Sequence, residues 1–156
     1  MKQNKTKIKE GVIFGVPIGK GFAVGLMARY SDHGILAYFL NRLYDNLPTV
    51  DEIRFEKNDI IYIVKAGDLG LKNGSWPILG TLEKWNRDEW NVPVFYKKGL
   101  IDEKLYAIHY NDELKFVRQE PIDSLENISR YPTDGTAGYE FVEKRLSKLL
   151  KRSENE

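Results

Sequence analysis

The stretch GVIFGVPIGKGFAVGLMARYSDHGILAYFL, residues 11–40, decides the fold. Apolar and β-branched runs occupy residues 12–18, 22–30 and 35–40, and glycine-containing turns separate them. Short β-rich runs bounded by such turns are typical of antiparallel hairpins. The stretch therefore predicts a three-stranded meander. The glycines inside its strands suggest bulges or the sharp bends that a small barrel needs.

Two further segments near the middle of the chain predict buried and edge strands. Residues 60–64, IIYIV, form a continuous apolar run bounded by polar residues, which predicts a central strand. Proline cannot donate a ladder hydrogen bond, so Pro77 predicts an edge or a bulge for the strand over 75–82. Thr49 and Glu52 have the spacing of a helix N-cap and its N3 partner, which predicts a short helical turn.

The last third of the chain combines predicted strands with a final segment whose apolar residues recur every three to four positions. Strands are predicted at 92–96 and, as a second hairpin turned at 111–113, at 105–110 and 114–118. An amphipathic helix is predicted over 136–151, because apolar residues recur there at helical spacing, namely Tyr139, Val142, Leu146, Leu149 and Leu150.

These elements predict a mainly β (α+β) fold. We expect an antiparallel small barrel or strongly bent sheet of about eight strands, with a C-terminal amphipathic helix. A chain of 156 residues has the size of one domain. Within it we expect a flexible basic N-terminus (1–9), a β-rich body (10–120), the helix (136–151) and a disordered tail (152–156).

Composition excludes several classes of function. The 24 Lys and Arg residues nearly balance the 23 Asp and Glu residues, so the net charge gives no reason to expect a nucleic acid or an anionic membrane as partner. No cysteine is present, which excludes disulfides and thiol catalysis. Because no apolar signal segment follows the basic start, we expect a cytoplasmic protein.

No motif for a cofactor, a metal or catalysis emerges. Gly19, Gly21 and Gly25 lie one residue away from a dinucleotide fingerprint, but strands and not a helix follow them, so a hairpin turn is the better interpretation. His33 and His109 have no metal-ligand spacing. We expect no catalytic residue, no cofactor and no metal.

Three acidic dipeptides and a tryptophan cluster are the features that suit recognition. Asp51–Glu52, Asp102–Glu103 and Asp112–Glu113 all lie in predicted turns, where solvated charge is the default interpretation. If these acidic loops converge, they form a negative patch able to steer a basic partner. Trp76, Trp85 and Trp90 either fill the core or form a platform for a partner.

Residues 11–25 and the segment Trp76–Pro77–Ile78–Leu79–Gly80 resemble the Imm26 family of bacterial immunity proteins. Residues 77–80 fit that family's motif of a proline, two hydrophobic residues and a glycine. The family's tryptophan–glutamate dipeptide has no counterpart here, since Asn91 follows Trp90. The resemblance implies a mainly β fold and a structural role for residues 76–80.

The resemblance also implies a function. Such a protein is a cytoplasmic, non-enzymatic antidote of a polymorphic toxin system, as in contact-dependent inhibition, and it binds and blocks a toxin domain encoded nearby. On charge, we expect the toxin-facing surface at Asp51, Glu52, Asp102, Glu103, Asp112 and Glu113, with Trp90 as an aromatic anchor. Two alternatives stay open, a small-barrel nucleic-acid-binding or adaptor module and a small enzyme.

Overall fold

A computed structural model describes residues 8–122 and 131–154 of the chain. Most of the N-terminus expected to be flexible, and residues 155 and 156 of the expected tail, lie outside the described residues. Within them the strands are β1 (Val12–Ile18), β2 (Gly21–Ser31), β3 (Gly34–Leu40), β4 (Ile60–Ala66), β5 (Ile78–Thr81), β6 (Phe95–Lys98), β7 (Leu105–Tyr110), β8 (Phe116–Pro121) and β9 (Thr136–Ala137). The helices are α1 (Leu69–Lys72) and α2 (Tyr139–Glu154), with short 3-10 turns at Val50–Glu52, Lys57–Asp59 and Arg87–Glu89.

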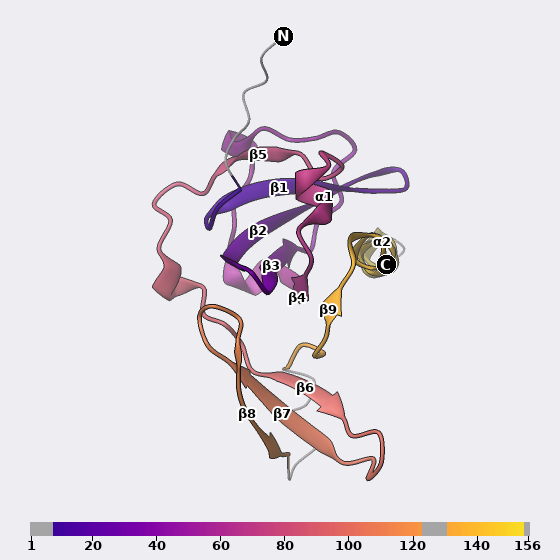
Figure 1. Cartoon of the computed structure of the whole chain (residues 1–156). Coiled ribbons are helices and arrows are strands. Elements are labelled where there is room, and N and C mark those ends of the chain that lie inside the picture. The colour runs from indigo at the N-terminus through magenta and orange to yellow at the C-terminus, as the bar shows by residue number, and fades with distance from the viewer. Residues whose placement is uncertain (1–7, 123–130, 155–156) are drawn as a thin grey trace.

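The strands form two sheets. The six-stranded sheet has the order β5-β1-β2-β3-β4-β9, and the three-stranded sheet has the order β6-β7-β8. The mainly β fold is confirmed, as is the meander, which forms β1, β2 and β3. The three-stranded sheet projects from one side of the six-stranded sheet (Figure 1).

The closed barrel that we considered is not found in the described part of the chain. The six-stranded sheet is open and ends at β5 and β9, which are four and two residues long. After β5 the chain leaves this sheet through an irregular segment and starts the three-stranded sheet. The described residues contain nine strands, one more than expected, because a two-residue strand precedes α2.

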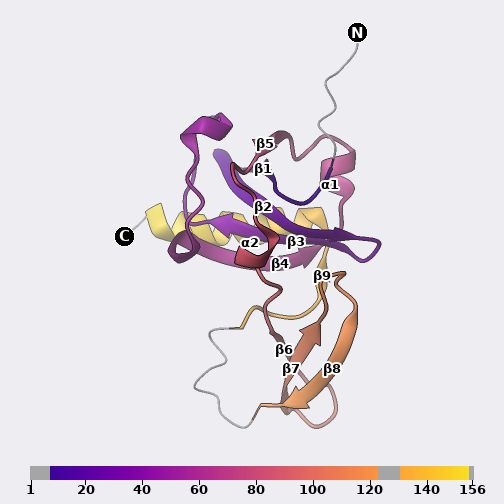
Figure 2. The same cartoon turned by 90° about the vertical axis from the view of Figure 1, so that its left-hand side faces the viewer.

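Both faces of the six-stranded sheet are covered, so its central strands are apolar on both sides. In β3, residues 35, 37 and 39 point into one hydrophobic cluster, and residues 36, 38 and 40 point into the other. The first cluster, the helix-side core, includes Val142, Leu146 and Leu150 of α2, which runs along this face (Figure 2). The second, the small-sheet-side core, includes Phe95 and Ile108 of the three-stranded sheet.

The turn glycines of the meander act as expected, whereas the glycine inside β2 does not form a bulge. Gly19 and Gly34 have φ angles of 64° and 110°, so they do form the predicted hairpin turns. Gly25, however, is paired regularly with Phe14 and Phe39. A Cβ atom there would lie 2.6 Å from the Phe39 ring and 2.8 Å from the Phe14 ring. Gly25 makes room for aromatic rings, and the bulge of β2 lies instead between Met27 and Arg29.

The structure corrects the position of the strand over residues 60–64. In the strand order β4 is second from the edge. Its outer neighbour β9 pairs with it only at Lys65 and Ala66. Residues 60–63 are only partly buried. The most buried strands are β2 and β3, and the run over residues 35–40 of β3 is continuously apolar as well.

The C-terminal helix is displaced from its predicted bounds. Residues 136 and 137 form β9, and α2 begins at Tyr139 and continues to Glu154. It therefore includes residues 152–154, which we expected to belong to the tail. The apolar stripe is confirmed, since Val142, Leu146 and Leu150 are buried against the sheet.

Leu146→Ala tests whether α2 is part of the core. Leu146 is fully buried, and truncating a buried leucine leaves a cavity, so we expect the free energy of unfolding to fall by about 2–4 kcal/mol. Urea denaturation measures the change. Lys148→Ala is the matched control on the exposed side of the same helix and should change stability by less than about 0.5 kcal/mol. Equal stability of the two variants would contradict this packing.

Candidate functional site

The three acidic dipeptides do not converge into one patch. Asp51 and Glu52 lie in the 3-10 turn beside the six-stranded sheet. Asp102–Glu103 and Asp112–Glu113 lie at opposite ends of the six-residue strand β7, about 20 Å apart at 3.3 Å per residue. The single negative patch that convergence would have produced is therefore absent from the described residues.

The first acidic pair forms a local cap. The Glu52 carboxylate accepts hydrogen bonds from the backbone N–H of Thr49 at 2.9 Å and from its hydroxyl at 3.0 Å. These two bonds hold the pKa of Glu52 below its usual value. The predicted capping box is confirmed. Both acids remain exposed, so their charge faces solvent.

The second acidic pair closes the loop between β6 and β7. Asp102 accepts hydrogen bonds from the Tyr106 hydroxyl and, at 2.9 Å, from the backbone N–H of Lys104. These bonds lower the pKa of Asp102, and the bond to Asp102 raises the pKa of Tyr106. Glu103 is exposed and has a positive φ of 59°. The carboxylate of Asp102 therefore shapes the loop.

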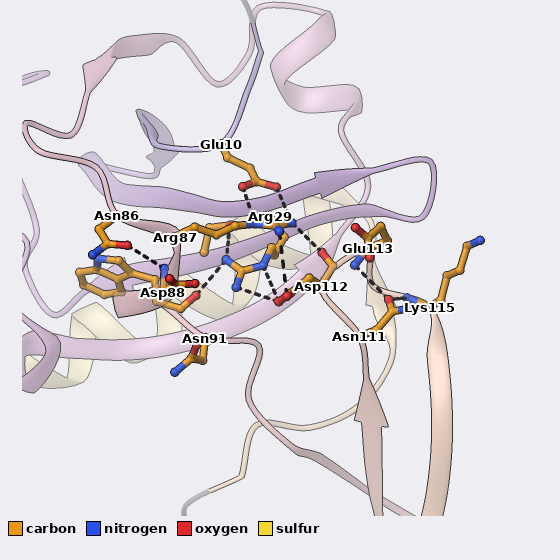
Figure 3. A network of polar contacts seen from close by, with 12 residues as sticks. Glu10, Arg29, Asn86, Arg87, Asp88, Asn91, Asn111, Asp112, Glu113 and Lys115 are labelled. Atoms are coloured by element: carbon orange, nitrogen blue, oxygen red, sulfur yellow. Dashed lines mark hydrogen bonds and ion pairs between the residues drawn. The ribbon is translucent and has the colours of Figure 1, made fainter.

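The two acids of the third pair have different surroundings. Asp112 accepts two hydrogen bonds from the guanidinium of Arg29, at 2.9 and 3.1 Å (Figure 3). Arg29 is 1% exposed, and it also donates to the carbonyl oxygens of Ala28 and Trp90. A buried arginine therefore pairs with Asp112, whose own side chain remains 55% exposed. Glu113 is exposed.

Sequence analysis missed Arg29, and a bulge explains why. Strict alternation along β2 would place Arg29 on the same face as Met27, towards α2. The bulge changes the register, so that Arg29 pairs with Leu36, whose side chain lies on the opposite face. A bulge re-aims the side chains that follow it. The signal that was available was a charged residue within an otherwise apolar strand.

Arg87 extends this network to the start of the described chain. Its guanidinium donates to both oxygens of the Glu10 carboxylate, at 2.9 and 3.2 Å, and to the carbonyl oxygen of Asp112 at 3.3 Å. Asn86 caps the 3-10 turn by accepting a hydrogen bond from the backbone N–H of Asp88 (Figure 3). The network joins the residues before β1, the connector after β5 and the β7–β8 turn.

A second buried cation, Lys65, lies near Arg29 in the six-stranded sheet. Lys65 of β4 lies 3.4 Å from Asp134 and 3.5 Å from the centre of the Tyr110 ring. Burial lowers the pKa of Lys65, and Asp134 opposes this shift. Burial and the hydrogen bond to Asp134 raise the pKa of Tyr110. Lys65 also pairs with Leu36, so the two buried cations flank this residue.

Trp90 does not form an exposed anchor. It is 5% exposed and packs edge-on against Tyr38 and Phe55 in the small-sheet-side core. The structure corrects our expectation here, since a side chain in this position cannot reach a partner. Its neighbour Trp85 packs partly buried against the same core.

The segment Trp76–Gly80 links the sheet to α2 and to the 3-10 turn. Trp76 is buried in the helix-side core, where it stacks on Phe14 and donates a 3.0 Å hydrogen bond to Glu143. The carbonyl oxygen of Pro77 accepts a hydrogen bond from Gly15. A Cβ atom on Gly80 would lie 3.0 Å from Val50. The side chains of Ile78 and Leu79 pack against the two different cores.

A groove of about 760 Å³ runs along β4, between α2 and residues 131–137. Its lining mixes apolar side chains, among them Ile61, Ile63 and Phe141, with polar groups that include Arg145 of α2. Asp134 also lines it, and this acid is held by Lys65 and Tyr110. Such a groove offers contact surface.

The two histidines lie in separate places. His109 lies 2.7 Å from Glu120 on the neighbouring strand, while His33 is exposed in its turn. Within residues 8–122 and 131–154, no group of three His, Cys, Asp or Glu side chains is placed to hold a metal ion. No helix among these residues is long and apolar enough to span a membrane.

Comparison with protein families gives one match. The family model for Imm26, described as immunity protein 26, matches residues 9–106, which is more than half of the chain. The matched region includes β1 to β6 and the first residues of β7. Neither the curated proteins nor the solved structures give a match.

Asp112→Ala tests the buried ion pair. The change leaves the Arg29 guanidinium buried without its carboxylate, so we expect the free energy of unfolding to fall by about 2 kcal/mol. Glu113→Ala is the matched control, because the adjacent acid is exposed. Combining Asp112→Ala with Arg29→Met should recover part of the loss, since the unpaired charge is then absent. Chemical denaturation of all three variants provides the measurement, and equal stability of the two single variants would contradict the assignment.

Tyr38→Phe tests the effect of burial on a phenol. Burial raises the pKa of Tyr38 to about 12, whereas an unfolded tyrosine ionises near pH 10. Between these values the unfolded state loses its proton first, so the free energy of unfolding falls as the pH rises, by up to about 1.4 kcal/mol per pH unit. The Tyr38→Phe variant has no phenol at this position, so its free energy of unfolding lacks this pH dependence.

At pH 8 we expect Tyr38→Phe to be less stable than the wild type by about 1 kcal/mol, because it loses the hydrogen bond to the Asn91 carbonyl. Between pH 10 and 12 the wild type should lose about 2 kcal/mol relative to the variant, so the difference reverses sign and the variant becomes the more stable protein. Contributions from other tyrosines cancel in the comparison. A difference that stays constant with pH, measured by urea denaturation, would rule out the burial effect.

Proposed function

Because the chain belongs to the Imm26 family of immunity proteins, we propose that it binds a cognate toxin domain and neutralises it. The protein acts in the cytoplasm of the cell that makes it. It occupies or blocks the active surface of the toxin and carries out no chemical step. The observation that carries this proposal is the family match over residues 9–106.

The arrangement of the described residues supports recognition through a preformed surface. Each of the two cores packs a face of the six-stranded sheet against another layer, and the buried cations tie the three-stranded sheet to it. A rigid surface loses little conformational entropy on binding. A stable complex of this kind buries about 1,600 Å² in total.

The exposed acids contribute in separate places. Asp51, Glu52, Asp102, Glu103 and Glu113 are exposed and suit basic groups on a toxin surface. Because they are dispersed, we propose that they steer association and set orientation locally. Asp112 is also exposed and belongs to this proposed surface with its charge paired to Arg29, whereas Trp90 is buried and lies outside it.

Co-expression tests the proposal. The toxin domain encoded beside this gene should arrest growth when expressed alone, and co-expression of this chain should restore growth. The chain should also copurify with a catalytically inactive variant of that toxin domain. A toxin that arrests growth equally with and without the chain, and that fails to copurify with it, would refute the proposed function.

A further inference from the structure

The loop between β6 and β7, residues 99–104, forms a hairpin tip with an unusual surface. Leu100 is 100% exposed and Ile101 is 99% exposed. The next most exposed large apolar side chain among the described residues is Phe141, at 60%. The tip lies at the end of the three-stranded sheet that points away from the six-stranded sheet (Figures 1 and 2). Two adjacent apolar side chains therefore project from the molecule with no cover.

The tip is held in shape by bonds that do not involve these two side chains. The backbone N–H of Gly99 donates to the carbonyl oxygen of Lys104 at 2.7 Å, and Asp102 accepts hydrogen bonds from Lys104 and Tyr106. A Cβ atom on residue 99 would lie 2.3 Å from the Asp102 carboxylate, so a side chain there would displace this carboxylate. The loop is preorganised, and ordering it costs little when it binds.

Charge near the tip is mixed. Lys97, Lys98 and Lys104 are exposed beside Asp102 and Glu103. This near balance gives no single-sign field, so the apolar pair supplies the contact energy. With two acids among them, the three lysines do not form the larger basic cluster that recognises an anionic membrane surface.

We propose that the hairpin tip is the anchor by which this protein enters an apolar cleft of its toxin, with Leu100 and Ile101 buried in the complex. This inference rests on the proposed function and adds which residues make the main contact with the toxin. A narrow convex loop is complementary to a concave site, and the active sites of enzymes are concave and largely apolar. Buried apolar anchors surrounded by polar residues supply most of the affinity in protein interfaces.

The test compares affinities for the toxin domain encoded beside this gene, purified as a catalytically inactive variant. The double variant Leu100→Ser/Ile101→Ser removes the apolar pair without changing the charge. Each leucine or isoleucine buried on binding contributes about tenfold or more in affinity, so the double variant should bind about 100-fold more weakly. Leu69→Ser is the matched control, since Leu69 is 55% exposed on α1, and it should bind within about threefold of the wild type.

Because both side chains are exposed, the double variant should unfold at the same urea concentration as the wild type, and loss of binding will not reflect misfolding. If the wild type binds the toxin and the double variant binds equally well, the hairpin tip is not the anchor, although the proposed function stands. If the wild type itself does not bind, the proposed function fails and the anchor fails with it.

Two further measurements test whether the hairpin tip instead binds a lipid surface or a second copy of this chain. Sedimentation of the wild type with vesicles of anionic phospholipid, or concentration-dependent self-association, would overturn the proposal if the double variant abolished either one. We expect neither to depend on Leu100 and Ile101.

Discussion

Two buried cations determine how the two sheets are joined. Arg29 and Lys65 lie on either side of Leu36 in the six-stranded sheet, and each meets an acid from outside this sheet, Asp112 or Asp134. Removing the partner of a buried charge costs several kcal/mol. The β7–β8 turn and the segment before β9 must therefore stay against the six-stranded sheet, and the opposite end of the three-stranded sheet points into solvent.

The apolar packing acts together with these ion pairs. Phe95 and Ile108 of the three-stranded sheet share a core with Leu36 and Tyr38. Residues 132–134 hydrogen-bond to Tyr96 of β6, and β9 follows directly and pairs with β4. One segment of chain thus connects the edges of both sheets. The result is a packed base with a projecting hairpin, the arrangement on which the proposed anchor depends.

Local patterns predicted the local elements well. The hairpin turns at Gly19 and Gly34, the Thr49–Glu52 cap and the apolar stripe of α2 all depend on residues close in sequence. Contacts between distant residues were not accessible in this way. The burial of Trp90 and the ion pair of Asp112 depend on Tyr38 and Arg29, which lie 52 and 83 positions away.

The order of residues 11–40 already implies the antiparallel meander and the mainly β class, because short apolar runs and glycine turns act within a few residues. The open six-stranded sheet and the separate three-stranded sheet were decided by long-range packing. The β2 bulge shows the physical reason. A shift of one residue in register moves a side chain to the other face of a sheet, and this shift aims Arg29 at Asp112. The register depends on the layers that pack on both faces, so only the assembled structure sets it.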